Sequence, residues 1–369
     1  MKSIKFDKIF LIITILLIIA ANCSQVIGSD FESININQLY AAQNNEIISH
    51  AEYEQVTELM ITWPTMFLLK IREEPYFIDI VRAAEKAVEV RINVNNNLYK
   101  NRVISKLNGE NIPLDNITIS ITPTNSIWIR DYGPFFIEKN GEISIIDFNY
   151  FGHRARLIDD IYPTLYGIKN DIEFDFKTNF ALCIQGGNYM SDGQGLAMVA
   201  NYSMEIGNPS MTLEEMSDVL KEYLGLDEVL ILTSQTDDGT GHIDMFSKLI
   251  SKDTLLVGQW QDTTEVNYQI LEDNAQLLID RGYNIIRIPM LRDPDEEKNT
   301  IWTYTNSLII NGTNKKIVLV PQYGAVEDST AIEIYEQVMP DYEIIGIYSN
   351  LVIDYFGAIH CTTMTRPLI

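Results

Sequence analysis

The sequence predicts an α/β protein in which helices and strands alternate. Amphipathic helical patterns recur along the chain, and each is followed by a short apolar strand pattern. Pairs of strand patterns separated by turn residues lie between these helix–strand units. No Pro-rich or Gly-rich linker divides residues 50–369, so we expect this region to be a single compact domain.

The helix expected over residues 212–224 has the clearest boundaries. Thr212 and Glu215 have the spacing of a capping box, and Gly225 follows the last helical position. Further helices are expected over residues 75–88, 265–281 and 329–338. Strands are expected over residues 90–94, 228–232, 283–288 and 343–347, and a hairpin over residues 307–310 and 316–321.

Residues 1–28 are typical of an export signal. Three lysines precede an apolar run over residues 9–19, which is short for a membrane span. We therefore expect a signal peptide over residues 1–28, a polar lead-in over residues 29–49, and a secreted or cell-envelope (periplasmic) protein with no stable membrane span. The sequence around Cys23 weakly resembles a lipoprotein signal, so acylation of Cys23 is an open alternative.

The chain is strongly acidic, with a formal net charge of −24. Such a charge repels phosphate backbones, which argues against nucleic acid as a partner. It suits a cationic substrate, although acidity also keeps an exported protein soluble. The hydrophobic content of 46% is that of a globular protein with a sizeable core.

Two of the three cysteines, Cys183 and Cys361, lie in the expected domain. A disulfide between them is one interpretation for an exported protein. Their contexts differ, however. Cys183 lies in the apolar run 180–184, whereas Cys361 follows His360 and precedes hydroxyl residues. The second context favours a reactive thiol.

Polar residues interrupt apolar strand patterns in four segments, and strand ends are where α/β proteins display functional groups. The segments are Ser126–Pro134, Gln185–Asn188, Gly239–Asp244 and Ile359–Met364. On a strand, His242 and Asp244 would share one face. Each segment alone is weak evidence, because Asp131, for example, can simply pair with Arg130. Together they supply the parts of one reaction.

That reaction is attack on a guanidinium carbon. A guanidinium is planar, always charged and matched by carboxylates, so Asp131 and Asp244 can hold its two sides. Cys361 must react as a thiolate, and a bound cation and a nearby imidazolium would lower its pKa. His242 can protonate the departing ammonia and then deprotonate a water. This chemistry requires no metal and no organic cofactor.

The same segments resemble the Porphyromonas-type peptidylarginine deiminase and agmatine deiminase family of guanidino-group-modifying enzymes. The matching stretches occur in the family order and are residues 128–134, 186–193, 241–244, 304–308, 339–345 and 360–361. The resemblance implies a pentein fold, a five-bladed α/β propeller with the active site on its central axis. It also implies Cys361 as the nucleophile, His242 as the catalytic histidine, Asp131 and Asp244 as guanidinium-binding carboxylates, and Asn306 as a supporting residue.

The segment Arg154-Ala155-Arg156 resembles an Arg-x-Arg motif of the secreted peptidylarginine deiminases, which recognises the α-carboxylate of a C-terminal arginine. Tyr132 and Asn188 also resemble that type. Gly239 departs from the family, in which an aromatic residue is expected near the catalytic histidine. The residues expected to bind substrate are Trp128, Arg130, Arg154, Arg156, Gly187 and Asn188.

The sequence therefore predicts an exported deiminase that converts free arginine, or arginine at a peptide C-terminus, to citrulline and ammonia through a thiouronium intermediate. The main alternative is an agmatine deiminase. Further alternatives are an amidinotransferase, a non-catalytic secreted protein on the same scaffold, and a metallohydrolase using His153, His242, Asp244 and His360. The expected partner is a small guanidine or a C-terminal-Arg peptide.

Overall fold

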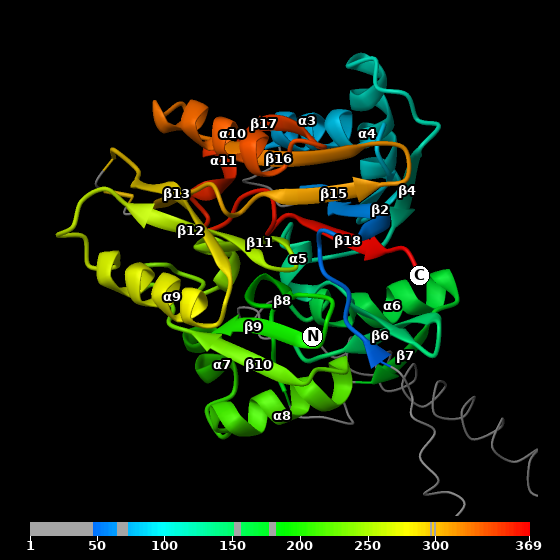
Figure 1. Cartoon of the computed structure of the whole chain (residues 1–369). Helices are drawn as coiled ribbons and strands as arrows, with labels where there is room; N and C mark the ends of the chain where they lie inside the picture. Colours follow the sequence, from blue (N-terminus) through cyan, green and yellow to red (C-terminus); the bar gives the residue numbers. More distant parts are fainter. Residues whose placement is uncertain (1–46, 65–72, 151–155, 177–181, 296, 299) are drawn as a thin grey trace, which may run out of the picture. The chain divides into compact units, whose positions relative to one another are not determined.

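The computed structural model describes residues 47–64, 73–150, 156–176, 182–295, 297–298 and 300–369. The predicted signal peptide, most of the predicted lead-in, and Arg154 lie outside the described residues. Residues 46–369 form one compact unit (Figure 1). Strand β1 (Ile47–Ile48) already pairs with β5, so the fold includes the last residues of the segment expected as a lead-in.

One arrangement recurs along the chain: two antiparallel strands, a helix, and a strand parallel to the second one. It is first seen in β5 (Phe135–Lys139), β6 (Glu142–Asp147), α6 (Tyr162–Asn170) and β7 (Glu173–Phe176). The next copies are β8 (Met190–Ser191), β9 (Leu196–Ala200), α8 (Leu213–Leu224) and β10 (Glu228–Leu232), then β11 (Ser247–Ser251), β12 (Thr254–Trp260), α9 (Tyr268–Asp280) and β13 (Asn284–Arg292), then β15 (Leu308–Gly312), β16 (Lys316–Gln322), α10 (Glu327–Val338) and β17 (Glu343–Tyr348).

The two ends of the described chain combine to form the same arrangement. Strand β18 (Thr363–Pro367) pairs antiparallel with β2 (Gln55–Thr62), and after α3 (Glu74–Ala84) strand β3 (Glu89–Val94) lies parallel to β2. Figure 1 shows β18, in red, beside β2, in blue. β2 also pairs with β15, so the sheet order is β17-β16-β15-β2-β3-β4, with β4 at Ile117–Ile121. The expected arrangement as five blades stays a prediction.

The remaining elements are short or lie between these units. They are α4 (Asn97–Gly109), α5 (Ile129–Tyr132), α7 (Asn201–Gly207), α11 (Asn350–Ile353), β14 (Ile301–Thr303) and three 3-10 turns at Asp159–Ile161, Gly186–Asn188 and Ile243–Met245. No helix among the described residues is both long enough and apolar enough to cross a membrane.

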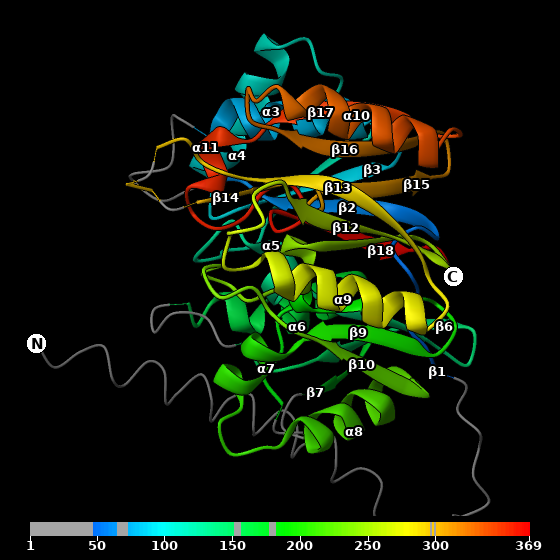
Figure 2. The same ribbon diagram turned by 60° about the vertical axis from the view of Figure 1, so that its left-hand side comes forward.

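The helices lie on the outer sides of the sheets (Figures 1 and 2). Each turns an apolar face inward, as α8 does with the buried residues Met216, Leu220 and Leu224. Burying such a leucine stabilises the fold by about 1.5–3 kcal/mol. The packed helix–sheet layers thus hold firmly the loops and short turns that carry polar residues toward the middle of the unit.

The clearest sequence signals are confirmed. The side chains of Thr212 and Glu215 form a capping box on α8, and Gly225 ends that helix with a φ of 66°. The predicted hairpin is the antiparallel pair β15–β16. Helix α3 ends at Ala84, earlier than expected, and the chain turns before entering β3. The strand expected just before Asp131 is wrong, because residues 129–132 form the short helix α5.

Candidate active site

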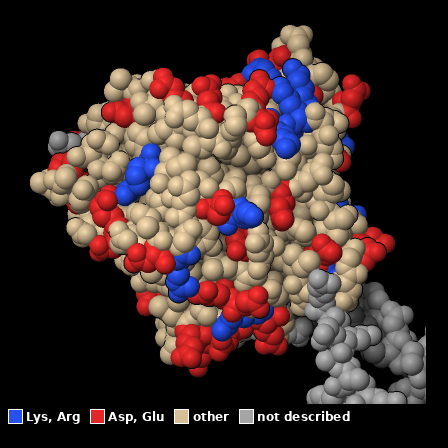
Figure 3. Space-filling model, in the orientation of Figure 1, with Lys and Arg blue, Asp and Glu red and all other residues tan. Residues whose placement is uncertain are grey.

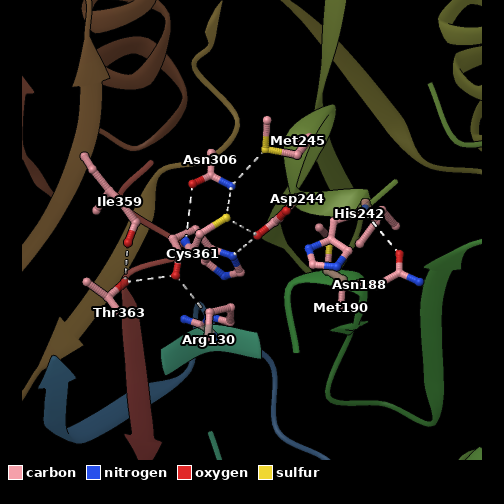
Figure 4. Close-up of polar contacts among 12 residues, drawn as sticks. Arg130, Asn188, Met190, His242, Asp244, Met245, Asn306, Ile359, Cys361 and Thr363 are labelled. Carbon is pink, nitrogen blue, oxygen red and sulfur yellow. Dashed lines mark hydrogen bonds and ion pairs between the residues drawn. The ribbon is translucent and has the colours of Figure 1, made fainter. Parts of the chain in front are cut away.

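Cys361 lies in the turn that precedes β18, and its side chain is buried, with 1% exposure. The Nδ2 group of Asn306 donates a hydrogen bond to Sγ of Cys361 at 3.1 Å, and Oδ2 of Asp244 lies 3.6 Å from Sγ (Figure 4). Oδ1 of Asn306 accepts hydrogen bonds from the backbone N–H groups of Ala358 and Cys361. Asn306 therefore holds both the sulfur and the turn that carries it. A supporting residue, as the sequence predicts Asn306 to be, would make such contacts.

Asp131, His242 and Asp244 meet next to this thiol. Asp131 comes from α5, and its Oδ1 lies 3.7 Å from Nδ1 of His242. The strand considered for His242 and Asp244 is not formed. His242 precedes the 3-10 turn Ile243–Met245, and Asp244 lies inside that turn. Figure 4 shows Asp244 between Cys361 and His242.

Gly187 is the point where these groups converge. A Cβ atom at this position would lie 2.6 Å from His242 Nδ1, 2.8 Å from Asp131 Oδ1 and 3.1 Å from Asp244 Oδ2. Any side chain would therefore fill the space that the three groups share. The absence of a side chain at Gly187 leaves that space open, which suits its expected place in substrate binding.

Three buried polar atoms on these residues have no hydrogen-bond partner among the described residues: Asp131 Oδ1, Asp244 Oδ1 and His242 Nδ1. Leaving such atoms unpaired costs about 1–3 kcal/mol each, so native proteins rarely do so without a reason. Two of the atoms are carboxylate acceptors and the third is an imidazole nitrogen. A ligand that carries several N–H donors and a positive charge satisfies all three.

Gln185 is a site residue to which sequence reasoning assigned no role. Its Oε1 atom lies 2.5 Å from Nε2 of His242. Because an amide oxygen only accepts, this contact places the proton of a neutral His242 on Nε2 and leaves the lone pair on Nδ1. The segment Gln185–Asn188 does stand out in the sequence, but nothing there indicates which of its polar side chains reaches the histidine.

Asn188 does not contact substrate as expected. Its Nδ2 group donates to the carbonyl of Ala200, and its Oδ1 accepts from the backbone N–H groups of Ala200 and Ile243. These bonds use the side chain to join the two 3-10 turns that carry Gly187 and Asp244. Asn188 therefore holds the backbone of the site in place.

Arg130 also lies outside the pocket of Cys361. Its Nε donates to the carbonyl of His360 at 3.4 Å, and its Nη2 lies 3.7 Å from Glu52. It lines a separate pocket, together with Glu52 and Lys248. The expected contact between Arg130 and substrate is therefore wrong, because the side chain points behind the turn that carries the nucleophile.

Cys361 opens into a cavity of about 260 Å³. The walls of the cavity are partly aromatic and partly polar, and they include Trp128, Asp131, Tyr150, Cys183, Gln185, Tyr202, Tyr355, Phe356 and Arg156. The expected lining residues Trp128 and Arg156 are present, and Nη1 of Arg156 donates to the hydroxyl of Tyr150 at 3.0 Å. Cys183 and Cys361 are both free thiols, so the disulfide interpretation is wrong.

Phe356 takes the place of the aromatic residue that Gly239 lacks. A Cβ atom at Gly239 would lie 3.0 Å from Cγ of Phe356, so the phenyl ring covers this glycine. Phe356 has a φ of 66°, a left-handed conformation that is uncommon for an aromatic residue. An aromatic ring thus lies against position 239, and it comes from a segment more than a hundred residues away.

The two carboxyl groups differ in their electrostatic setting. Burial raises the pKa of Asp131 to about 6, with the charge of His242 opposing this and that of Asp244 adding to it. Burial also acts to raise the pKa of Asp244, but the hydrogen bond and charge of His360 lower it below its ordinary value. Asp244 is therefore ionised over a wider pH range than Asp131.

The surroundings of Cys361 favour the protonated thiol. Burial, followed by the charges of Asp244 and Asp131, raises its pKa well above the ordinary value, and the hydrogen bond from Asn306 opposes this only in part. Among the described residues, no group of three or more His, Cys, Asp or Glu side chains is arranged to hold a metal ion.

The sequence matches the family model of Porphyromonas-type peptidyl-arginine deiminases over residues 48–367. A protein of Marinomonas sp. (strain MWYL1), provisionally named an agmatine deiminase, is 23% identical over 361 residues, covering 86% of this chain and 93% of the relative. A relative from Enterococcus faecalis with the same provisional name is 28% identical over 288 residues, covering 68% of this chain and 77% of the relative.

Solved structures show the same fold. A substrate-bound variant of the agmatine deiminase of C. jejuni has a TM-score of 0.78 at 20% identity, covering 88% of this chain and 97% of that chain. A protein of Porphyromonas gingivalis, provisionally named an arginine deiminase, has a TM-score of 0.76 at 25% identity, covering 87% and 98%. The described residues therefore have the α/β pentein fold of the deiminases.

Proposed function

The chain belongs to the Porphyromonas-type peptidyl-arginine deiminase family, and we propose that it hydrolyses the guanidinium group of agmatine to N-carbamoylputrescine and ammonia. The family and its relatives are hydrolases of amidine C–N bonds. The observation that carries the proposal is the set of unpartnered buried atoms on Asp131, Asp244 and His242, which meet beside the thiol of Cys361.

A guanidinium satisfies these atoms in one pose. Its N–H groups donate to Oδ1 of Asp131 and to the carboxylate of Asp244, and Oδ1 of each carboxylate lacks a hydrogen-bond partner among the described residues. Charge-assisted bonds of this kind contribute about 1.5–3 kcal/mol each. The space left by Gly187 takes the planar group, and its carbon faces Sγ of Cys361.

The bound cation prepares the nucleophile. Its positive charge offsets the two carboxylates that keep Cys361 protonated, so the thiol loses its proton once the guanidinium is in place. Nδ1 of His242, which carries the lone pair, accepts a proton at this stage. The new S–C bond gives a tetrahedral adduct held between Asp131 and Asp244.

The adduct then loses ammonia and is hydrolysed. Nδ1–H of His242 protonates the leaving nitrogen as the C–N bond breaks, which leaves a thiouronium ester on Cys361. Nδ1 next takes a proton from a water molecule that attacks the same carbon. The S–C bond breaks, the ureido product leaves, and the thiol is restored. Overall, one guanidinium and one water give one ureido group and one ammonium ion.

Agmatine is proposed as the substrate because the two sequence relatives and the C. jejuni structure named above carry the agmatine deiminase name over most of this chain. One observation favours a second candidate, arginine or a peptide that ends in arginine. Arg156 lines the cavity, and Asp131 is the sole carboxylate among the described lining residues. A cation such as Arg156 suits a substrate that has a carboxylate at its far end.

A substrate panel separates the two candidates. Ammonia release is measured with agmatine, free arginine and a C-terminal-Arg peptide, for the wild type and for Arg156→Ala. We expect kcat/KM to be at least about tenfold higher for agmatine, and Arg156→Ala to leave it equal or higher, because a repulsive charge is removed. Preference for the peptide, lost in Arg156→Ala, would overturn agmatine in favour of the second candidate.

We also propose that the protein is exported. The support is the sequence of residues 1–28, with its basic start and apolar run. N-terminal sequencing of the protein from its native cell fractions tests this, and an intact Met1 in the cytosolic fraction would contradict it. Incorporation of labelled palmitate at Cys23 would show lipid anchoring instead of release.

A further inference from the structure

A chain of buried ionisable groups extends away from the nucleophile. Nδ1 of His360 lies 2.7 Å from Oδ2 of Asp244, and its Nε2 lies 2.6 Å from Oε2 of Glu52. Glu52 is paired in turn with Lys248, whose Nζ also donates to the carbonyl of Ser307 at 2.8 Å. Each ring nitrogen of His360 therefore faces a carboxylate oxygen at hydrogen-bond distance.

A second cation faces this chain from α5. Nη2 of Arg130 lies 3.7 Å from Glu52, and its Nε donates to the carbonyl of His360. His360, Lys248, Asp244 and Arg130 are all nine-tenths buried or more, so water screens their charges little. The chain links the inner end of the Cys361 site to the pocket lined by Glu52.

The protons of this chain can be counted from the geometry. A neutral imidazole donates from one nitrogen alone, so two ionised carboxylates cannot both be satisfied by it. His360 lowers the pKa of Asp244, although burial opposes this. Burial likewise opposes ionisation of Glu52, but Lys248 and His360 lower its pKa well below the ordinary value. Hydrogen bonds to two ionised carboxylates need a proton on each ring nitrogen of His360.

We propose that His360 is a positioning residue for guanidine hydrolysis, held as an imidazolium between Asp244 and Glu52 and keeping Asp244 charged for the substrate. Its bond occupies Oδ2 of Asp244, which fixes the rotation of the carboxylate. Oδ1 of Asp244 is then left without a hydrogen-bond partner among the described residues. The inference rests on the proposed function, and it explains what keeps Asp244 ionised.

The imidazolium also moderates the field on the nucleophile. Asp244 is the charged group that raises the pKa of Cys361 most, and it lies 3.6 Å from the sulfur. A positive charge 2.7 Å behind that carboxylate partly offsets its effect on the thiol. Without His360, Asp244 loses the hydrogen bond and the charge that lower its pKa most, and the charges of His242 and Arg130 remain against the effect of burial.

The pH dependence of kcat/KM tests the positioning role in His360→Gln. In the wild type one group, Asp131, is expected to control the acid limb, so log kcat/KM falls with a slope of one below about pH 6. In the variant Asp244 titrates as well, so we expect the slope of log kcat/KM to approach two. At pH 7.5 we expect kcat/KM to be lower by about tenfold or more, mainly through a higher KM. A uniform loss with an unchanged slope would overturn the inference.

His50→Gln is the matched control. His50 also lies between two carboxylates, with Nδ1 2.9 Å from Glu54 and Nε2 3.0 Å from Glu138. It does not line the cavity of Cys361. The same substitution there should leave the slope and midpoint of the acid limb unchanged. A change in slope in both variants would show a general effect of losing a buried histidine and would count against the inference.

Nitrogen-15 NMR of the wild-type protein gives a test that needs neither a folded His360 variant nor turnover. The chain has four histidines, so His50→Gln, His153→Gln and His242→Asn identify the other three ring signals and leave that of His360. We expect both ring nitrogens of His360 to carry protons at pH 7.5. A neutral tautomer would overturn the inference, even if the enzyme is active. An imidazolium in a protein that hydrolyses no guanidine would instead refute the proposed function, and with it the positioning role, while the charge of His360 would stand.

Discussion

Asp131 and Asp244 face the same guanidinium space with opposite shifts in pKa. No protein group forms a hydrogen bond to Oδ1 of Asp131 among the described residues, and burial raises the pKa of this group to about 6. Asp244 is bonded to His360, which lowers its pKa. At neutral pH both carboxyl groups are ionised, and their negative charge attracts a guanidinium. On acidification Asp131 is protonated before Asp244.

The first prediction concerns the protonation of Asp131. Asp131 is charged above about pH 6 and neutral below it, so kcat/KM for the guanidine should fall tenfold per pH unit below that value. Because a bound cation stabilises the ionised form, the acid limb of kcat should lie at lower pH than that of kcat/KM. Steady-state kinetics between pH 4.5 and 8, in buffers of constant ionic strength, check both statements.

Asp131→Asn sharpens the same test. Loss of the charge should lower kcat/KM by about 100-fold at pH 7.5, as expected for charge-assisted bonds of about 1.5–3 kcal/mol each. The acid limb near pH 6 should disappear from the remaining activity. If the limb stays in place in Asp131→Asn, another group controls it and the assignment to Asp131 is wrong.

The second prediction concerns Gly187. In Gly187→Ala the new methyl group would fall 2.6 Å from Nδ1 of His242 and 2.8 Å from Oδ1 of Asp131, inside van der Waals contact. We expect kcat/KM to drop by at least about 100-fold, since a displacement near 1 Å of catalytic groups has that effect. The melting temperature is measured alongside kcat/KM, so that a loss of activity is separated from a loss of stability.

Gly109→Ala is the control for this substitution. A Cβ atom at Gly109, the last residue of α4, meets nothing within 4 Å. That variant should keep wild-type kcat/KM. Wild-type activity in Gly187→Ala would mean that the guanidinium binds elsewhere.

At the scale of single elements, local sequence signals predicted what local interactions determine. The ends of α8 follow from Thr212, Glu215 and Gly225, which act within one turn of the helix. The segment around Asp131 was misread as a strand because its residues Ile127, Trp128 and Ile129 are apolar and β-prone. They are buried in the core, and that tertiary packing holds a short helix that propensity does not favour.

The third prediction concerns the segment that leads from β1 into β2. His50 in this segment bonds Glu54 and Glu138, and Glu138 lies on β5. The bond to Glu54 and the charges of both carboxylates raise the pKa of His50 above 6.5, with burial opposing. The resulting stabilisation is fully present below pH 6.5 and is lost as pH rises through the raised pKa. His50→Gln should therefore lower the melting temperature more at pH 6 than at pH 9.

Thr212→Ala supplies the comparison. It removes a cap on α8 that is worth about 1 kcal/mol and that does not depend on a group titrating between pH 6 and pH 9. Its effect on the melting temperature should be the same at both values. Thermal unfolding followed by circular dichroism measures both variants, and a loss for His50→Gln that is equal at the two pH values would contradict the account.

At the scale of the whole molecule, the site is assembled from segments far apart in the sequence. Asp131, Gly187, His242, Asn306 and Cys361 come from different segments of the fold and meet at one site, where Nδ1 of His242 lies 3.7 Å from Oδ1 of Asp131 and Asn306 bonds Sγ of Cys361. The residue types and the family resemblance predicted this set. They did not predict Gln185, Glu52 or Lys248, because the contacts of these side chains depend on how the units close around the site. Residue order alone does not carry that information.

The fourth prediction concerns the net charge of −24. Acidic side chains are spread over the face of the protein shown in Figure 3, and many of them lie over α8. Such a field attracts cations over several ångströms and is screened by salt. Raising ionic strength from about 20 to 500 mM should lower kcat/KM for agmatine, a dication, several-fold and leave kcat unchanged. Arginine, which carries a carboxylate, should lose less. An equal loss for both would point to a general salt effect.

The central claim is that Cys361 attacks a guanidinium carbon and carries the thiouronium ester. Its direct test is mass spectrometry of the protein quenched in acid during turnover of agmatine. The account predicts a mass increment on the peptide containing Cys361 equal to that of agmatine less ammonia. It also predicts no increment and at least about 1,000-fold less ammonia in Cys361→Ser. Steady turnover without that adduct on Cys361, or ammonia release that survives Cys361→Ser, would contradict the account.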